Sequence, residues 1–318
     1  MIKRLGRQWR RIGLTLITLA VAATILGALL YRERAVLLAY DWDLKWRNLA
    51  LALPVLVGGL LLAAYIWGDI MRTVGSRAPM SLHVRYYALS QLARRLPGTL
   101  WYVAGRGYLY RRHGDSVRLV TLASGLELIV SVASGALFTL ALAGYVLAGL
   151  PRYYGGGLIL TALLGLAAMH PRFIRYLLIR IGREDAPFIP YPRLIGWLVG
   201  YAVLWCVGGF VLYLIADAVY PLPLSTLPYL AGSFSLMGTL SVLVFFLPSN
   251  FGFTEVGLSL LLSALVPSSF AVLIAVLNRI LVMLYELIGL GLIMLIGRIN
   301  GADSSSAPPI QADDPAVM

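Results

Sequence analysis

Ionisable residues inside long apolar runs are the residues of this chain that could do chemistry. Glu127, Arg279 and Glu286 each lie within a stretch that is otherwise largely apolar, and Glu255 lies between two such stretches. A charged side chain inside a bilayer is costly, so it usually faces a partner or a polar pathway. These residues therefore indicate a site or a path within a membrane rather than a soluble active site.

Glu127 belongs to a polar stripe on one side of its helix. Ser124, Glu127, Ser131 and Ser134 follow three- and four-residue spacing, which places them on one helical face. The stripe could line a cavity. Alternatively, its serines could serve close helix packing and its carboxylate a static ion pair. Arg279 is the expected partner of Glu127, because paired charges lower each other's cost in an apolar interior.

Two short breaks interrupt the most apolar regions, and they resemble each other. The first contains Pro97 and the second Pro248; Glu127 follows the first by 30 residues, and Arg279 follows the second by 31. Broken helices at membrane depth are tolerated only where they are buried in protein or line a cavity. Finding the pattern twice predicts two related halves around one cavity.

Charged residues beside the breaks have two interpretations each. Arg94, Arg95 and Arg106 surround the first break and could attract lipid phosphate, at about 1 kcal/mol for each arginine. The alternative is ordinary positive charge on the cytoplasmic side of the membrane. Near the second break, Glu255 could stabilise a helix start capped by Thr254, or the free amides of that helix could bind an anionic head group.

Composition places the chain among polytopic membrane proteins. Hydrophobic residues make up 60% and charged residues 13% of its 318 residues, and the mean hydropathy is +0.83. The net charge of +12 lies mostly between apolar runs, which indicates membrane orientation rather than nucleic-acid binding. Cys206 is the only cysteine and the three histidines are scattered, so neither a disulfide nor a metal site is expected. We expect no cofactor.

The elements that must position these residues are helices, so the expected fold is an all-α membrane bundle of about eight spans. The expected spans cover residues 12–31, 49–67, 119–148, 156–170, 194–216, 229–247, 254–266 and 270–297. The seventh is too short to cross a bilayer alone. Residues 100–110 predict either a re-entrant half-helix or a deep interfacial hairpin, and residues 81–96 and 173–182 predict helices lying at the interface.

The expected spans form one transmembrane domain over residues 1–298, with halves of about 1–170 and 171–298. Residues 299–318 predict a disordered tail. Twenty of the 26 basic residues lie on one side of the predicted spans, so both termini are expected to face the cytoplasm. The expected location is the inner membrane of the cell, which the chain crosses several times.

Several of these motifs resemble a known family. The stretch from Tyr87 to Trp101, then Gly105-Arg106, the segment 110–114 and Glu127 resemble the membrane domain of lysylphosphatidylglycerol synthases and their stand-alone flippase-like relatives. The segment 248–255 and Arg279 resemble the second signature of that family, although serine and asparagine replace its usual glycines. The synthases carry a cytosolic aminoacyltransferase domain, and this chain ends in a short tail, so the resemblance implies lipid translocation rather than aminoacyl transfer.

The expected function is therefore a flippase-like transporter that moves a phospholipid or polyprenyl-linked head group between leaflets. The alternatives are an integral-membrane enzyme or accessory subunit in lipid-linked glycan or aminoacyl-lipid assembly, or a scaffold. The expected partners are membrane lipids, and a dimer is one option for the oligomeric state. The expected substrate-binding and translocation residues are Arg94, Arg95, Pro97, Gly98, Arg106, Glu127, Ser131, Pro248, Asn250, Glu255, Arg279 and Glu286.

Overall fold

The described part of the protein is entirely helical outside its loops. The structure is a computed structural model, and it describes residues 34–93, 101–182, 188–243 and 252–299, together with residues 24, 27, 28 and 31. Within these ranges the backbone forms helices joined by short turns, with no strand. The all-α prediction is confirmed for this part of the chain.

Five helical segments are long and apolar enough to cross a membrane, and a bent pair raises the number to six if it counts as one span. The five are α3 (Trp46–Thr73), α6 (Val117–Ala141), α10 (Tyr191–Val219), the segment Leu224–Leu243 made of η1 (Leu224–Thr226) and α11 (Leu227–Leu243), and α13 (Ser268–Ile299). The bent pair is α8 (Arg152–Ala168) and α9 (Pro171–Arg180), which meet at 59°. The chain is a polytopic helical membrane protein.

The remaining helices are short. They are α2 (Arg34–Ala39), α4 (Met80–Ala93), α5 (Trp101–Arg111), α7 (Ala143–Val146) and α12 (Phe253–Leu262). Local chemistry sets several helix starts: the Ser116 hydroxyl accepts a hydrogen bond from the Leu119 amide at 3.2 Å as the N-cap of α6. Pro171 occupies the first turn of α9, where a missing amide donor costs nothing.

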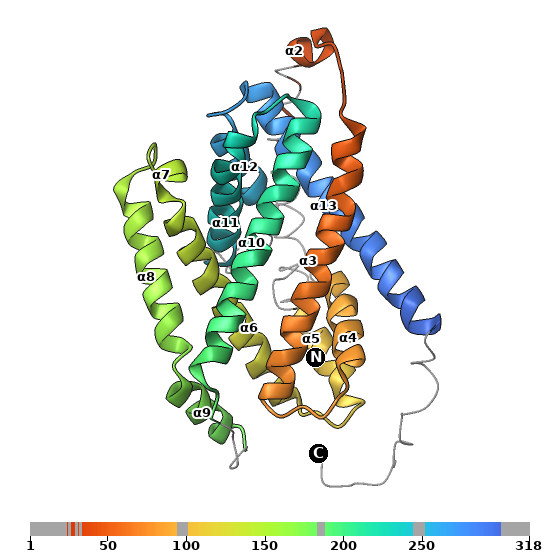
Figure 1. Ribbon diagram of the computed structural model, residues 1–318, viewed down its shortest axis with the longest axis vertical. Helices are drawn as coiled ribbons and strands as arrows, with labels where there is room; N and C mark the ends of the chain where they lie inside the picture. Colours follow the sequence, from red (N-terminus) through yellow and green to blue (C-terminus); the bar gives the residue numbers. More distant parts are fainter. Residues whose placement is uncertain are drawn as a thin grey trace, which may run out of the picture.

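The long helices run both up and down through the bundle. In Figure 1, α3 descends from the upper end of the molecule to the lower end, α6 and α10 ascend, and α13 descends obliquely behind them. Contacts fix the antiparallel pairing of α3 and α10: the Lys45 amide donates to the Ala218 carbonyl at the upper end. At the lower end, Trp197 Nε1 donates to Asp69. These two helices pack together more extensively than any other pair.

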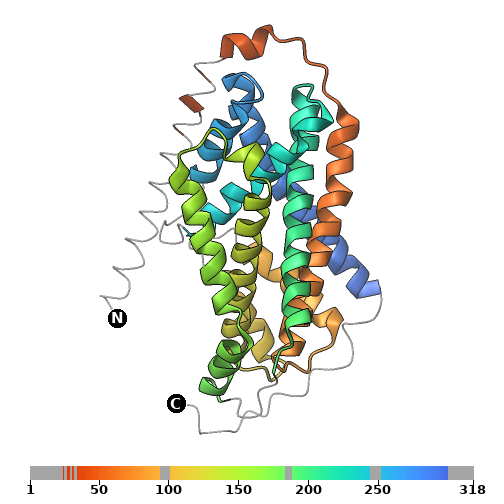
Figure 2. The ribbon, with the colours of Figure 1, turned by 60° about the vertical axis from the view of Figure 1, so that its left-hand side comes forward.

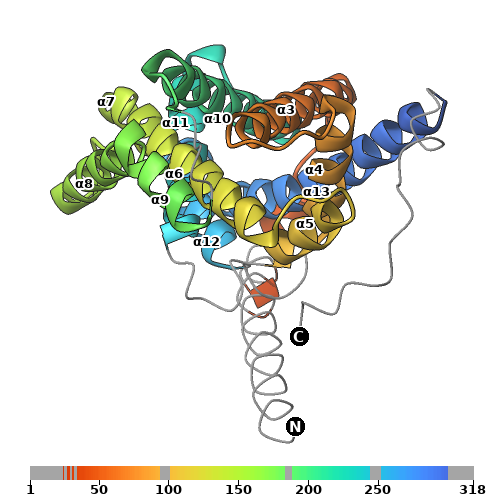
Figure 3. The ribbon, with the colours of Figure 1, turned by 90° about the horizontal axis from the view of Figure 1, so that it is seen from below.

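Two antiparallel helix pairs lie at opposite ends of the bundle (Figure 2). Helices α4 and α5 lie at the lower end, where Tyr110 near the end of α5 contacts His83 near the start of α4. Helices α11 and α12 pair at the upper end, where the Tyr229 hydroxyl donates to the Leu261 carbonyl. Seen from below, α8 lies at one edge of the bundle and the end of α13 at the other (Figure 3).

The described residues hold five or six helices that could span a membrane, where eight spans were predicted for the whole chain. Most of the predicted span 12–31 lies outside the described residues, and the predicted segment 254–266 corresponds to the ten-residue helix α12. The half-helix predicted at residues 100–110 is present as α5. The helix predicted at residues 81–96 is present as α4, which packs against α3, α5 and α13 and buries His83, Tyr87 and Ser90. The tail from residue 300 onwards lies outside the described residues.

Candidate functional site: two intramembrane ion pairs

Arg106 and Glu127 form an ion pair in the interior of the lower half of the bundle. The Arg106 side chain is 0% exposed and that of Glu127 is 4% exposed. Both terminal nitrogens of Arg106 donate to the carboxylate, and the Tyr201 hydroxyl of α10 donates to Glu127 Oε1 at 3.0 Å. Arg106 Nε donates to Ser90 Oγ at 3.0 Å. Buried charges need this degree of pairing and hydrogen bonding to be tolerated.

Aromatic rings enclose the Arg106 guanidinium. Its central carbon lies 3.9 Å from the ring centroid of Trp67, 4.8 Å from that of Tyr87 and 5.1 Å from that of Tyr102. All three distances fall within the range of cation–π attraction. The enclosure brings together α3, α4 and α5, so Arg106 fixes the lower helices to one another and is sealed from lipid in this conformation.

A hydrogen-bonded chain extends from this cluster toward the lower end. Trp67 Nε1 donates to the Tyr110 hydroxyl at 2.9 Å, and that hydroxyl lies 2.6 Å from His83 Nδ1. Because indole nitrogen can only donate, the Tyr110 hydroxyl accepts from Trp67, and the tautomer of His83 decides which of Tyr110 and His83 donates to the other. Burial lowers the pKa of His83 to about 4, so its imidazole is neutral at pH 7.

Glu255 and Arg279 form a second ion pair in the other half of the chain. Arg279 Nε lies 3.6 Å from Glu255 Oε1, and the side chains are 34% and 3% exposed, respectively. The other carboxylate oxygen accepts from the Gly252 amide at 2.6 Å, which stabilises the start of α12. Glu255 therefore has both roles at once, helix stabilisation and charge pairing.

Two sequence predictions about these residues are wrong. Glu127 pairs with Arg106 rather than Arg279, because α5 packs against α6 and places Arg106 next to the Glu127 carboxylate. Arg279 pairs with Glu255 instead. The cap of α12 is Gly252, whose φ of 90° favours glycine, and not Thr254.

The other described candidates lie near these pairs with different surroundings. Ser131 is half-buried and its carbonyl accepts from Trp205 Nε1 at 3.2 Å, whereas Ser134 donates its hydroxyl to the Leu198 carbonyl. Glu286 lines a small crevice of about 150 Å³. Its walls come from α3, α4 and α13: Leu60, Ala88, Gln91, Met283, Glu286, Leu287 and Leu290.

Six predicted site residues cannot be placed. Both breaks lie outside the described residues, and with them lie Arg94, Arg95, Pro97, Gly98, Pro248 and Asn250.

Sequence reasoning missed the groups that complete the first ion pair. Ser90, Trp67 and Tyr201 come from three helices. Ser90 lies in the Tyr87–Trp101 stretch before the first break, but Trp67 and Tyr201 are far from that break in sequence and no local pattern marks them. A further missed cluster joins α3 to α10: Asp217 accepts from Lys45 at 2.8 Å and from Asn48 at 2.7 Å, which closes the upper end.

The chain matches no known protein-family model and no curated protein. In the described part of the chain, no three histidine, cysteine, aspartate or glutamate side chains lie close enough together to hold a metal ion. What stands on the geometry alone is a polytopic membrane protein with two ion pairs inside its helical bundle.

Proposed function

We propose that this protein is a flippase-like transporter that moves a phospholipid or lipid-linked head group between membrane leaflets. The observation that carries the proposal is the pair of intramembrane ion pairs, each joining a short helix to the long helix that follows it. A purely structural bundle gains little from buried charge, since apolar residues of similar volume hold helices together as well or better. Intramembrane ionisable groups generally mark a pathway.

The two ion pairs occupy corresponding positions in two units of the fold. The first unit is α3 to α6 and the second is α10 to α13, and each consists of a long helix, a short antiparallel pair and a second long helix. Glu127 is the eleventh residue of α6, and Arg279 is the twelfth of α13. The units run in opposite directions through the bundle (Figure 1), which is the arrangement of an inverted repeat.

The charges of the two units are exchanged. In the first unit the short helix carries the arginine and the long helix the glutamate, whereas in the second the short helix carries Glu255 and the long helix Arg279. Inverted repeats build transporters whose substrate site lies between the halves. Because the arginine lies on the short helix in one unit and on the long helix in the other, a zwitterionic or anionic head group would meet one arginine in each unit as it moves.

The two ion pairs differ in accessibility. Arg106 is sealed by aromatic rings, whereas a third of the Arg279 side chain is exposed. In an alternating mechanism this difference reverses when one unit rocks against the other. Arg279 is therefore the group that contacts the head group phosphate in this conformation, and acyl or prenyl chains remain in lipid beside α13.

Charge distribution and motif resemblance support the same assignment. The arginine-rich lower end, with Arg72, Arg112 and Arg118, faces the cytoplasm by the positive-inside rule. The motifs around Pro97 and Pro248 resemble those of flippase-like membrane domains, as set out above.

The test is lipid movement in reconstituted vesicles. Proteoliposomes that hold a panel of fluorescent phospholipids and a polyprenyl phosphate are compared with protein-free vesicles. Dithionite added outside the vesicles bleaches only probes in the outer leaflet, so loss of the remaining fluorescence measures movement of lipid from the inner leaflet. The wild type is expected to accelerate movement of at least one lipid, and Glu127→Gln is expected to slow it tenfold or more while remaining monodisperse. Equal rates with and without protein for the whole panel would remove the transport assignment.

A further inference from the structure

A polar pocket at the lower end of the bundle lies apart from both ion pairs. It has a volume of about 420 Å³ and is lined by two loops, one between α3 and α4 and the other between α5 and α6. Its lining residues are Gly75, Arg77, Ala78, Pro79, His113, Gly114 and Asp115. Pockets for small ligands commonly hold roughly 300–1,000 Å³, so this one could enclose a compact polar group.

The two loops are held at a fixed separation. Asp115 is 8% exposed and accepts a hydrogen bond from Ser76 Oγ at 2.7 Å, which ties one loop to the other. Gly75 and Gly114 have φ values of 105° and 81°, which allow the sharp turns that bring the loops together. The pocket is therefore a built feature of the loops and not a chance gap between side chains.

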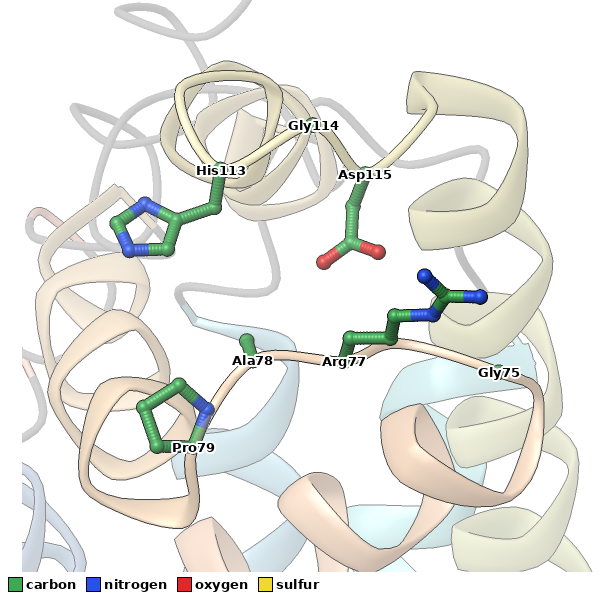
Figure 4. A pocket seen from close by; sticks show the side chains of 7 residues that line it. All are labelled: Gly75, Arg77, Ala78, Pro79, His113, Gly114 and Asp115. Carbon is green, nitrogen blue, oxygen red and sulfur yellow. The ribbon is translucent and has the colours of Figure 1, made fainter. Parts of the chain in front are cut away.

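Two nitrogen-bearing side chains of the pocket, those of Arg77 and His113, have nitrogen atoms available to bind a ligand. Arg77 is exposed and makes no hydrogen bond or ion pair with any described residue. His113 uses Nδ1 toward the Tyr86 hydroxyl at 3.3 Å, and its Nε2 has no hydrogen-bond partner among the described residues. Figure 4 shows Arg77 and His113 on opposite sides of the opening, with the Asp115 carboxylate between them.

The side chain of Arg77 favours an anion. Arg77 is the one arginine among the residues that line the pocket, and Asp115 is the one carboxylate. Asp115 Oδ2 accepts the hydrogen bond of Ser76 Oγ, so one carboxylate oxygen is used to hold the loops together. Arginine presents a planar fork of donors that matches phosphate oxygens.

We propose that this pocket binds a phosphate group, with Arg77 and His113 as its ligating side chains. The phosphate belongs either to a lipid head group or to a soluble phosphorylated compound. The site is independent of the proposed transport activity. It nevertheless touches the same machinery, because His113 contacts Tyr86, Tyr86 packs edge-on against Tyr110 at 5.0 Å, and Tyr110 bonds Trp67 of the Arg106 enclosure.

Thermal unfolding of the delipidated protein in detergent tests the site. Sodium phosphate is titrated against sodium chloride at equal ionic strength. A parallel series uses nanodiscs of phosphatidylcholine with and without phosphatidylglycerol. The variants are Arg77→Ala and the double variant Arg77→Ala/His113→Ala. Arg180→Ala is the matched control, since Arg180 is an exposed arginine whose guanidinium contacts Tyr176.

Stabilisation of the wild type and of Arg180→Ala by inorganic phosphate, with at least fivefold weaker apparent affinity in Arg77→Ala, would establish a site for a soluble phosphate. Stabilisation confined to phosphatidylglycerol nanodiscs, with the same dependence on Arg77, would establish a lipid head group as the ligand. If Arg77→Ala and the double variant respond like Arg180→Ala in both series, the pocket is not a phosphate site. Because Arg77 is exposed and makes no contact that holds the fold, its removal leaves a folded protein to measure.

Discussion

At the scale of single residues, the best-defined feature is the enclosure of Arg106. Its guanidinium meets a carboxylate, a serine and three aromatic rings, so the cost of burying the charge is offset by contacts on every side. The sequence alone could single out Glu127, because a carboxylate in an apolar run is conspicuous. It could not identify the partner, because pairing depends on which helix packs against α6.

Removal of one charge from this pair should be more harmful than removal of both. Glu127→Leu leaves Arg106 buried without its carboxylate and should destabilise the protein by about 3–5 kcal/mol. Arg106→Met combined with Glu127→Leu removes both charges and should recover most of that loss. Unfolding in a graded SDS series measures both, with Arg112→Ala as an exposed arginine control.

A double variant as unstable as Glu127→Leu would contradict the proposed cost of an unpaired Arg106 charge. That result would mean that the loss comes from packing rather than from an unpaired charge.

At the scale of elements, sequence reasoning succeeded where a segment is short and bounded. The short helices predicted at residues 100–110 and 173–182 are present as α5 and α9, whose bounds differ from the predicted ones by one or two residues. The interfacial position of α4 stays a prediction, but its alternating basic and apolar residues gave no sign of the polar face that packs inward. Ser90 and Tyr87 on that face surround the buried charge of Arg106.

Close helix packing at glycine is the second element-scale feature. A Cβ atom added to Gly209 of α10 would lie 2.3 Å from the Ala231 Cα of α11 and could be accommodated only by moving backbone. We expect Gly209→Ala to destabilise the protein by about 1–3 kcal/mol. Gly196→Ala is the control on the same helix, since a Cβ there meets nothing within 4 Å. It should be neutral, or stabilising by up to about 1 kcal/mol.

Thermal unfolding of the two glycine variants measures how closely α10 and α11 pack. Equal midpoints for Gly209→Ala and Gly196→Ala would show that α10 and α11 do not pack as closely as described.

At the scale of the whole molecule, the proposed inverted repeat makes a prediction about topology. The loop after α5 and the loop after α12 should lie on opposite sides of the membrane, because the two units run in opposite directions. The test uses a Cys206→Ser background with Arg112→Cys or Ala264→Cys, both exposed positions, and a membrane-impermeant maleimide. Arg112→Cys should react only from the cytoplasmic side, and Ala264→Cys only from the opposite side.

Labelling of both cysteines from one side would contradict the repeat. The two related halves stay a prediction from the paired breaks, and the sequence did not indicate exchanged charges. The exchange becomes visible only when the ion pairs are known, because it depends on which short helix packs against which long one.

The central claim is that Arg279 contacts the transported head group and is not merely a partner of Glu255. The measurement that tests it most directly is the rate of phospholipid movement in proteoliposomes for three proteins: the wild type, Arg279→Glu, and the exchanged pair Arg279→Glu/Glu255→Arg. The exchange restores an ion pair between the two positions while placing the arginine on α12. We predict that the exchanged pair regains part of the thermal stability lost in Arg279→Glu, because an arginine at position 255 cannot accept from the Gly252 amide at the start of α12. We predict that it moves lipid at less than a tenth of the wild-type rate. Recovery of both stability and transport by the exchanged pair would contradict the claim and leave the ion pair a structural one.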